Sequence, residues 1–260
     1  MKILADTHLH LYPCFDLDHI FSGLLNQFGS KDLQIPRVAC LAERADCNFY
    51  HRLQAGEPLL HNFRVEVESI RNLLLLEKNS NRQLTLLPGR QIITAEKIEV
   101  LALCTTATFT ENVPVAEVIR SILEQNGIPV LPWSPGKWFF QRGQVIEDLL
   151  HQYTPQDFLI GDVSLRPQGW LTPLLMRKAL RRGYKVVSGS DPLPFSSEEK
   201  SAGMYGSKII SSAEGLTPDN MLHSLLNGRA ESTSFGQRSN PLELFRRLRC
   251  NAEVRKQAMV

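Results

Sequence analysis

The strongest constraint on the fold is a repeated order of elements in the second half of the chain. Between residues 115 and 188, a segment with helical spacing of apolar residues is followed three times by a short, continuously apolar run. These runs predict buried strands at 128–131, 158–163 and 184–188, and glycines precede the first and the last of them. Alternating helices and buried strands are typical of βα units, whose strands pair in parallel.

The first half predicts further strands of the same kind, at residues 1–5, 37–42, 84–93 and 98–103, while residues 45–83 appear mostly helical in pattern. We therefore predict an α/β fold: a single (β/α) barrel-like domain over residues 1–260, a distorted TIM-like barrel with about seven parallel strands. Its last part, 208–260, is expected to contain a strand and two helices. The basic residues of the final helix, Arg247 among them, are expected to lie on a solvated face.

Bulk properties limit the partners. Hydrophobic residues make up 43% of the 260-residue chain and charged residues 22%, as is usual for soluble globular proteins. A net charge of +2 does not favour nucleic acid, and no apolar run has the length of a membrane span. Five cysteines without a CxxC pair suit reduced thiols, and residues 1–5 do not have the pattern of a secretory signal. We expect a cytoplasmic protein that has no membrane partner.

The first candidate site is Asp6-Thr7-His8-Leu9-His10, directly after the first apolar run. Side chains two apart on a strand share a face, so His8 and His10 should point together, with Asp6 in line behind them. Two converging imidazoles are suitable ligands for a divalent transition metal. The alternative is that one histidine caps a loop and the other is a solvated surface residue.

Several segments, in order along the chain, resemble motifs of the PHP (polymerase and histidinol phosphatase) family. Residues 6–10 look like the opening motif, and Asp16 lies where many members have the Asp of a Ser-Asp-Gly turn. Residues 127–131 resemble the strand before an Ala-His-Pro motif, and 188–191 resemble a late Gly-Ser-Asp-x-His motif. The resemblance covers residues 1 to about 195 and implies a metal-dependent phosphoesterase.

The chain departs from this family pattern at several ligand positions, and the Thr-Asp-His usual in the family is missing around residues 40–44, where Glu43 is the nearest potential ligand. Gln91 stands where a bridging Glu is usual, Trp133 where a ligand His is usual, and Leu193 replaces the His of the late motif. Relatives commonly hold up to three metals, whereas His8, His10 and Asp191 remain here for one. The resemblance therefore implies at most about one divalent ion, Zn, Mn or Fe, with Asp191 also in a catalytic role. Additional candidate ligands are Asp6, Asp16, Glu43, Gln91 and Glu99.

A cluster of aromatic and basic residues follows the strand at 128–131. Trp133, Lys137 and Arg142 are candidates for a substrate rim that grips a small phosphorylated molecule. The alternative is a hydrophobic plug that fills the space of lost metals. At the level of the whole chain, the first hypothesis is a metal-dependent hydrolase, above all a phosphoesterase that uses a metal-activated water. The second is a catalytically degenerate PHP-like barrel that binds a ligand or a protein.

Overall fold

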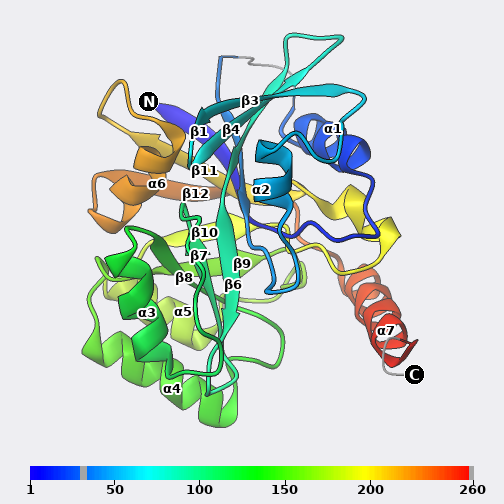
Figure 1. The fold of residues 1–260 in the computed structure, drawn as a ribbon. Coiled ribbons are helices and arrows are strands. Elements are labelled where there is room, and N and C mark those ends of the chain that lie inside the picture. The colour runs from blue at the N-terminus through cyan, green and yellow to red at the C-terminus, as the bar shows by residue number, and fades with distance from the viewer. Residues whose placement is uncertain (30–33, 258–260) are drawn as a thin grey trace.

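The computed structural model describes residues 1–29 and 34–257, which form a mixed α/β fold built on two sheets (Figure 1). The first sheet contains, in spatial order, β12 (Ala230–Gly236), β11 (Tyr205–Ser211), β1 (Lys2–Leu9), β2 (Arg37–Leu41), β5 (Gln83–Leu87), β4 (Asn72–Glu77) and β3 (Phe63–Ser69). The second contains β10 (Val186–Gly189), β9 (Leu159–Val163), β8 (Ile128–Pro132), β7 (Glu99–Leu103) and β6 (Gly89–Ile93). The helices are α1 (Leu17–Gln27), α2 (Phe49–Gln54), α3 (Val115–Glu124), α4 (Phe140–Gln152), α5 (Leu174–Arg181), the 3-10 helix η1 (Ser196–Ser201), α6 (Pro218–Leu226) and α7 (Pro241–Gln257).

The predicted TIM-like barrel of parallel strands is wrong, because the strands form two open sheets of seven and five strands with mixed directions. Among the described strands, only the pairs β1–β2, β2–β5, β8–β9 and β9–β10 are parallel. The helix–strand alternation from residue 115 onward does exist. Its strands pair in parallel only from β8 to β10, because β8 pairs antiparallel with β7, and β7 pairs antiparallel with β6. Apolar runs predict that a strand is buried, but they do not predict its direction.

The predicted helical character of residues 45–83 is also wrong. Only α2 is helical there, and β3 and β4 then form an antiparallel hairpin whose second strand pairs with β5. Leu73 and Leu75 are fully buried, whereas Leu74 and Leu76 are only partly buried. This alternation is typical of a strand. Within a run of four leucines, helical and strand periods are both satisfied, and pairing with β5 decides between them.

Three clusters of buried side chains hold the layers together. One packs α1 and α2 against the first sheet, and a second packs α3, α4 and α5 against the second sheet. A third contains residues from both sheets together with α6, including Ala5, Leu101 and Val187. Figure 1 shows α3, α4 and α5 in green below the sheets, and α7 in red standing out to one side.

The junction between β1 and β10 positions the candidate site. These strands lie side by side although they belong to different sheets. The Thr7 hydroxyl donates to the carbonyl of Ser188 at 2.9 Å, and the backbone N–H of Asp191 donates to the carbonyl of His8 at 2.9 Å. Gly189 allows this approach, because a Cβ there would lie 2.8 Å from His8 Cα. The carboxyl ends of the two strands therefore meet.

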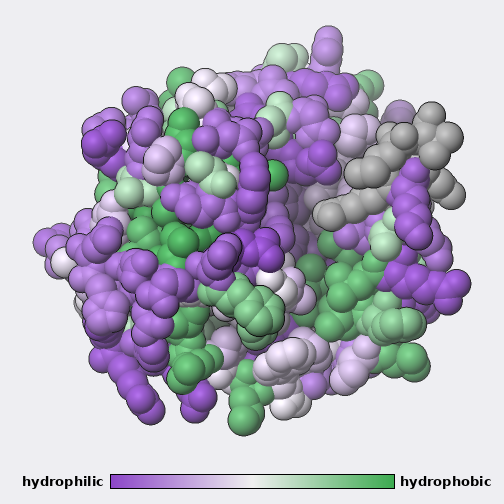
Figure 2. Space-filling model, turned by 90° about the horizontal axis from the view of Figure 1, so that it is seen from below, coloured by the Kyte–Doolittle hydropathy of each residue, from purple (hydrophilic) through white to green (hydrophobic). Residues whose placement is uncertain are grey.

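The C-terminal part contains the predicted strand and helices, as β11, α6 and α7, together with β12, which was not predicted. Seen from below the view of Figure 1, the surface carries hydrophobic patches between hydrophilic residues and a hollow towards its centre (Figure 2). Across the part of the chain that the structure describes, no helix has both the length and the apolar character needed to cross a membrane.

Candidate metal centre

Three side chains converge where β1 and β10 end. His8 Nε2 and His10 Nε2 lie 3.1 Å apart, and Asp191 Oδ1 lies 3.7 Å from the first and 3.5 Å from the second. Two ligand atoms bonded at about 2.0–2.1 Å to one tetrahedral zinc ion would be about 3.3 Å apart. The spacing of the three atoms is therefore compatible with a single divalent ion. Within residues 1–29 and 34–257, this is the one group of three such ligand residues.

The local backbone explains this convergence. Leu9 is fully buried in the core beneath α1, so the alternation of the strand turns His8 and His10 to the opposite face. The two imidazole rings meet edge to face with centroids 4.9 Å apart, and His10 stacks on Tyr12. Asp191 follows β10 with a φ of 49°, in the left-handed region that a non-glycine residue seldom adopts.

Burial determines the charges of these ligands. Desolvation lowers the pKa of His8 to about 4, and that of His10 to about 3, where the neighbouring charge of His8 adds to the effect. Both imidazoles are therefore neutral near pH 7 and offer lone pairs to a metal. Desolvation raises the pKa of Asp191, against the lowering effects of His10, Arg247 and Lys137. A bound cation would favour the ionised carboxylate.

The outer shell of the histidines is less complete than in most metal centres. Ligating histidines usually donate their second ring N–H to a carbonyl or a carboxylate. Within the described part of the chain, Nδ1 of His8 and Nδ1 of His10 are buried without a hydrogen bond, although the Ala42 carbonyl lies near enough to favour protonation of His10. Packing, and the stack on Tyr12, orient the rings instead.

Asp6 lies behind the triad, where its oxygens accept four hydrogen bonds. The backbone N–H groups of His8, Ser190 and Gly203 donate at 3.1, 2.9 and 3.0 Å, and the Ser190 hydroxyl donates as well. Burial raises the pKa of Asp6, while these bonds lower it. Asp6 thus connects β1 to the Asp191 loop, and its oxygens are already occupied by donors.

Asp16 and Glu43 lie apart from the triad. The exposed Asp16 caps α1 by accepting from the backbone N–H of His19 at 3.0 Å. The buried Glu43 accepts from the backbone N–H groups of Phe49 and Tyr50, and burial raises its pKa. The structure does not bring either carboxylate to the metal ligands.

Gln91, Glu99 and Lys137 are joined to one another beside His8. Gln91 Nε2 donates to Glu99 Oε1 at 3.3 Å, and Lys137 forms an ion pair with the same oxygen. All three act on the pKa of His8: Glu99 and Gln91 raise it, and Lys137 lowers it. They therefore line one side of the triad, as an amide and a neutralised charge pair.

The remaining rim candidates differ in exposure. Trp133 is 1% exposed and meets Trp170 edge on, with centroids 6.3 Å apart, so it lies in the core and not at an open rim. It shares a buried apolar cluster with Leu193. Arg142 is half-buried and donates to the carbonyl of Gly136 at 2.9 Å.

Two basic residues near the triad were missed at the level of sequence. The Arg44 guanidinium lies over the Tyr12 ring, 6.0 Å from its centroid, next to the ring that stacks on His10. The feature of the sequence that could have identified Arg44 is its position just after β2, beside Glu43. Arg247 was expected to be solvated but is 3% exposed, so this expectation is wrong. Arginines spaced along a basic helix do not reveal which one is turned inward.

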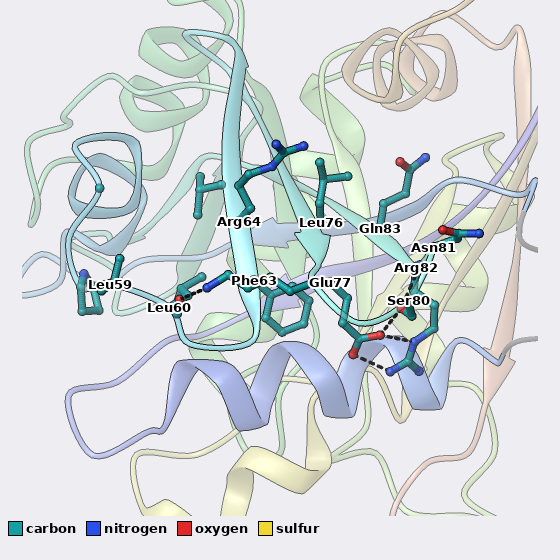
Figure 3. A pocket seen from close by; sticks show the side chains of 14 residues that line it. Leu59, Leu60, Phe63, Arg64, Leu76, Glu77, Ser80, Asn81, Arg82 and Gln83 are labelled. Carbon is teal, nitrogen blue, oxygen red and sulfur yellow. Dashed lines mark hydrogen bonds and ion pairs between the residues drawn. The ribbon is translucent and has the colours of Figure 1, made fainter.

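A separate cavity of about 790 Å³ borders the β3–β4 hairpin and shares no lining residue with the triad. Figure 3 shows Phe63 and Leu60 on one side, and the ion pair between Glu77 and Arg82, at 2.6 Å, on the other. Its lining includes no His, Cys or Asp. We therefore place the candidate chemistry at the triad.

Solved structures with a similar fold include the following two. PsfC from Pseudomonas syringae PB-5123 matches with a TM-score of 0.58 and 14% identity, covering 100% of this chain and 99% of that one. The lesion-specific endonuclease PfuEndoQ from Pyrococcus furiosus matches with a TM-score of 0.54 and 10% identity, covering 91% of this chain and 59% of that one. At these identities the likeness shows a shared fold and not a shared activity. No family model matches the chain, and no curated protein matches it.

Proposed function

We propose that this chain is a metal-dependent hydrolase, and more specifically a phosphoesterase, with His8, His10 and Asp191 as the ligands of one Zn, Mn or Fe ion. The observation that carries the proposal is the convergence of three ligand atoms, 3.1–3.7 Å apart, from two neutral imidazoles and one carboxylate. When bound at a site of this kind, a divalent ion supplies Lewis acidity and an activated water.

The residues of the chain have distinct tasks in this proposal. The two imidazoles contribute neutral donors from a strand end that the core holds in place. Asp191 would contribute the negative charge that holds the cation, and as a carboxylate it could orient a water at the ion. Lys137, whose side chain is 33% exposed, and Arg44 are the cationic groups near the triad. Each is paired with a carboxylate, Glu99 and Asp46, and an anionic phosphoryl group would bind in exchange for these partners.

The substrate class follows from these charges. We propose a small phosphorylated molecule, held by Lys137 and by the half-buried Arg142. The structural similarity to a lesion-specific endonuclease weighs against our expectation from net charge, so polynucleotides are tested as the second substrate class.

A binding protein without catalysis is the second candidate. It is favoured by Trp133 and Leu193, which are buried and apolar, and by Gln91, which brings no charge. A site with one ion cannot hold both the attacking and the leaving oxygen as a metal pair does. Under this hypothesis the triad is a remnant without a catalytic role.

Hydrolysis assays separate the two candidates. Initial rates are measured for phosphomonoesters, phosphodiesters, carboxylic esters and DNA with and without lesions, with added Mn²⁺ or Zn²⁺ and with a chelator. We expect metal-dependent hydrolysis that is lost in His8→Ala and kept in His61→Ala, a control at an exposed histidine outside the triad. Activity that survives His8→Ala would refute metal-dependent hydrolysis at this site, and absence across the panel would favour the binding protein.

A further inference from the structure

Arg247 on α7 is a buried cation with an unusually complete set of partners. Its guanidinium donates to both carboxylate oxygens of Glu198 on η1, at 2.6–3.0 Å. It also donates to the hydroxyls of Ser164 and Ser239, at 3.0 and 2.7 Å, and its Nη2 reaches the Asp191 carbonyl at 3.4 Å. Such a planar fork can satisfy several acceptors at once, which a lysine cannot.

The loop that carries Asp191 is held at three places, twice by residues that Arg247 binds and once by Arg247 itself. The Ser164 hydroxyl donates to the carbonyl of Ser190, and the backbone N–H of Leu193 donates to Glu198 Oε2 at 3.1 Å. The third place is the direct, long contact with the Asp191 carbonyl. On the other side of the loop, Asp6 and the His8 carbonyl hold the N–H groups of Ser190 and Asp191.

These contacts do more than anchor helix α7, because they also fix the backbone of the loop that carries Asp191. Asp191 has a φ of 49°, so its backbone stays in a sparsely populated region only if its surroundings hold it there. Its carboxylate must also stay within 3.5–3.7 Å of two histidine nitrogens. Fixing the backbone on both sides of Asp191 does this.

We propose that Arg247 is a positioning residue for the metal centre, so that helix α7, which lies outside the motifs of the first 195 residues, completes the site. The inference rests on the proposed metal-dependent function. It assigns to the C-terminal segment a role in metal affinity, through Glu198, Ser164 and the loop of residues 190–193.

The test compares metal binding with stability in the full chain. Arg247→Met with Glu198→Gln removes both buried charges together, so that neither is left unpaired. The matched control is Arg82→Met with Glu77→Gln, a second bidentate Arg–Glu pair between the end of β4 and the residue before β5, away from the triad. Affinity for Co²⁺ and Zn²⁺ is measured by competition with a chromophoric chelator, alongside the visible spectrum of the Co²⁺ form and thermal unfolding.

We expect the Arg247→Met and Glu198→Gln double variant to bind both ions at least about tenfold more weakly, with an altered Co²⁺ spectrum, as when an outer-shell partner is lost. The control should lose stability only. Should the double variant fail to fold, Arg247→Lys keeps the charge and gives the same readouts. If a folded Arg247 variant keeps the wild-type affinity and spectrum, the inference about Arg247 is overturned and the proposed function is not. A wild-type chain that binds neither ion would overturn the proposed function and the inference with it.

Discussion

Replacing Gly189 by alanine should break the site and destabilise the fold. The added Cβ would lie 2.8 Å from His8 Cα and closer still to the backbone nitrogen and Cβ of His8. These are atoms that cannot rotate away. Ordinary contacts of this kind need about 3.5–4.0 Å, so β10 must move away from β1 by about 1 Å.

The expected cost follows from what this movement disrupts. Overpacking in a well-packed interior costs about 1–3 kcal/mol. The bonds Thr7 Oγ1 to Ser188 O and Asp191 N to His8 O, both 2.9 Å, cross the same junction and are worth about 1 kcal/mol each. We expect the free energy of unfolding to fall by about 3–5 kcal/mol. Affinity for a divalent ion should also fall, because Asp191 moves away from His8.

The assay is urea unfolding, together with Zn²⁺ or Co²⁺ titration of the folded protein. The control is Gly23→Ala in the middle of α1, where a Cβ would meet nothing within 4 Å and φ is not positive. That change should leave metal affinity unaltered and stabilise the helix by up to about 1 kcal/mol. Wild-type stability and affinity in Gly189→Ala would refute the tight junction of β1 and β10.

Four further outcomes are expected. Elemental analysis of protein purified without chelator should find at most about one divalent ion per chain, and two or three would show that other side chains have become ligands. Asp191→Asn should weaken metal binding about tenfold or more in chelator competition while the fold is kept, because the amide has the shape but not the charge. Lowering the pH of metal-free protein from about 6.5 to 4 should cost about 3 kcal/mol of unfolding free energy through His8 alone. The reason is that the unfolded imidazole takes up a proton in this range and the folded one does not. The measurement is urea unfolding as a function of pH, and an equally steep loss of stability in a His8→Gln chain would contradict this prediction. Trp133→His should recruit a second ion, measured by elemental analysis, only together with Gln91→Glu, and a second ion in the single variant would show that the carboxylate is not needed.

The amino-acid pattern was sufficient for the local parts of this protein. The alternation of His8, Leu9 and His10 predicted that both imidazoles face the same side, because the side-chain period of a strand is two. The apolar runs at 128–131 and 158–163 predicted strands that are found as β8 and β9. Such inferences succeed because they depend only on residues that are neighbours in the chain.

The pairing of distant segments was decided by tertiary structure. Nothing in the run from Leu73 to Leu76 distinguishes helix from strand, and hydrogen bonds to β5 make it a strand. Strand direction in β7 and β8 likewise depends on which edges meet, so two open sheets form where a parallel barrel was predicted. Backbone hydrogen bonds between segments far apart in sequence are not encoded in local periodicity.

The same division holds at the site. The residue types of the triad were recognisable in the sequence, but only the fold brings Asp191 within 3.7 Å of a histidine that lies 183 positions before it, at His8. Only the fold turns Arg247 inward to Glu198 and away from solvent, and only the fold saturates Asp6 with donors. A carboxylate or a guanidinium in a sequence has no fixed role until burial removes water and leaves specific partners, and that step belongs to the tertiary structure.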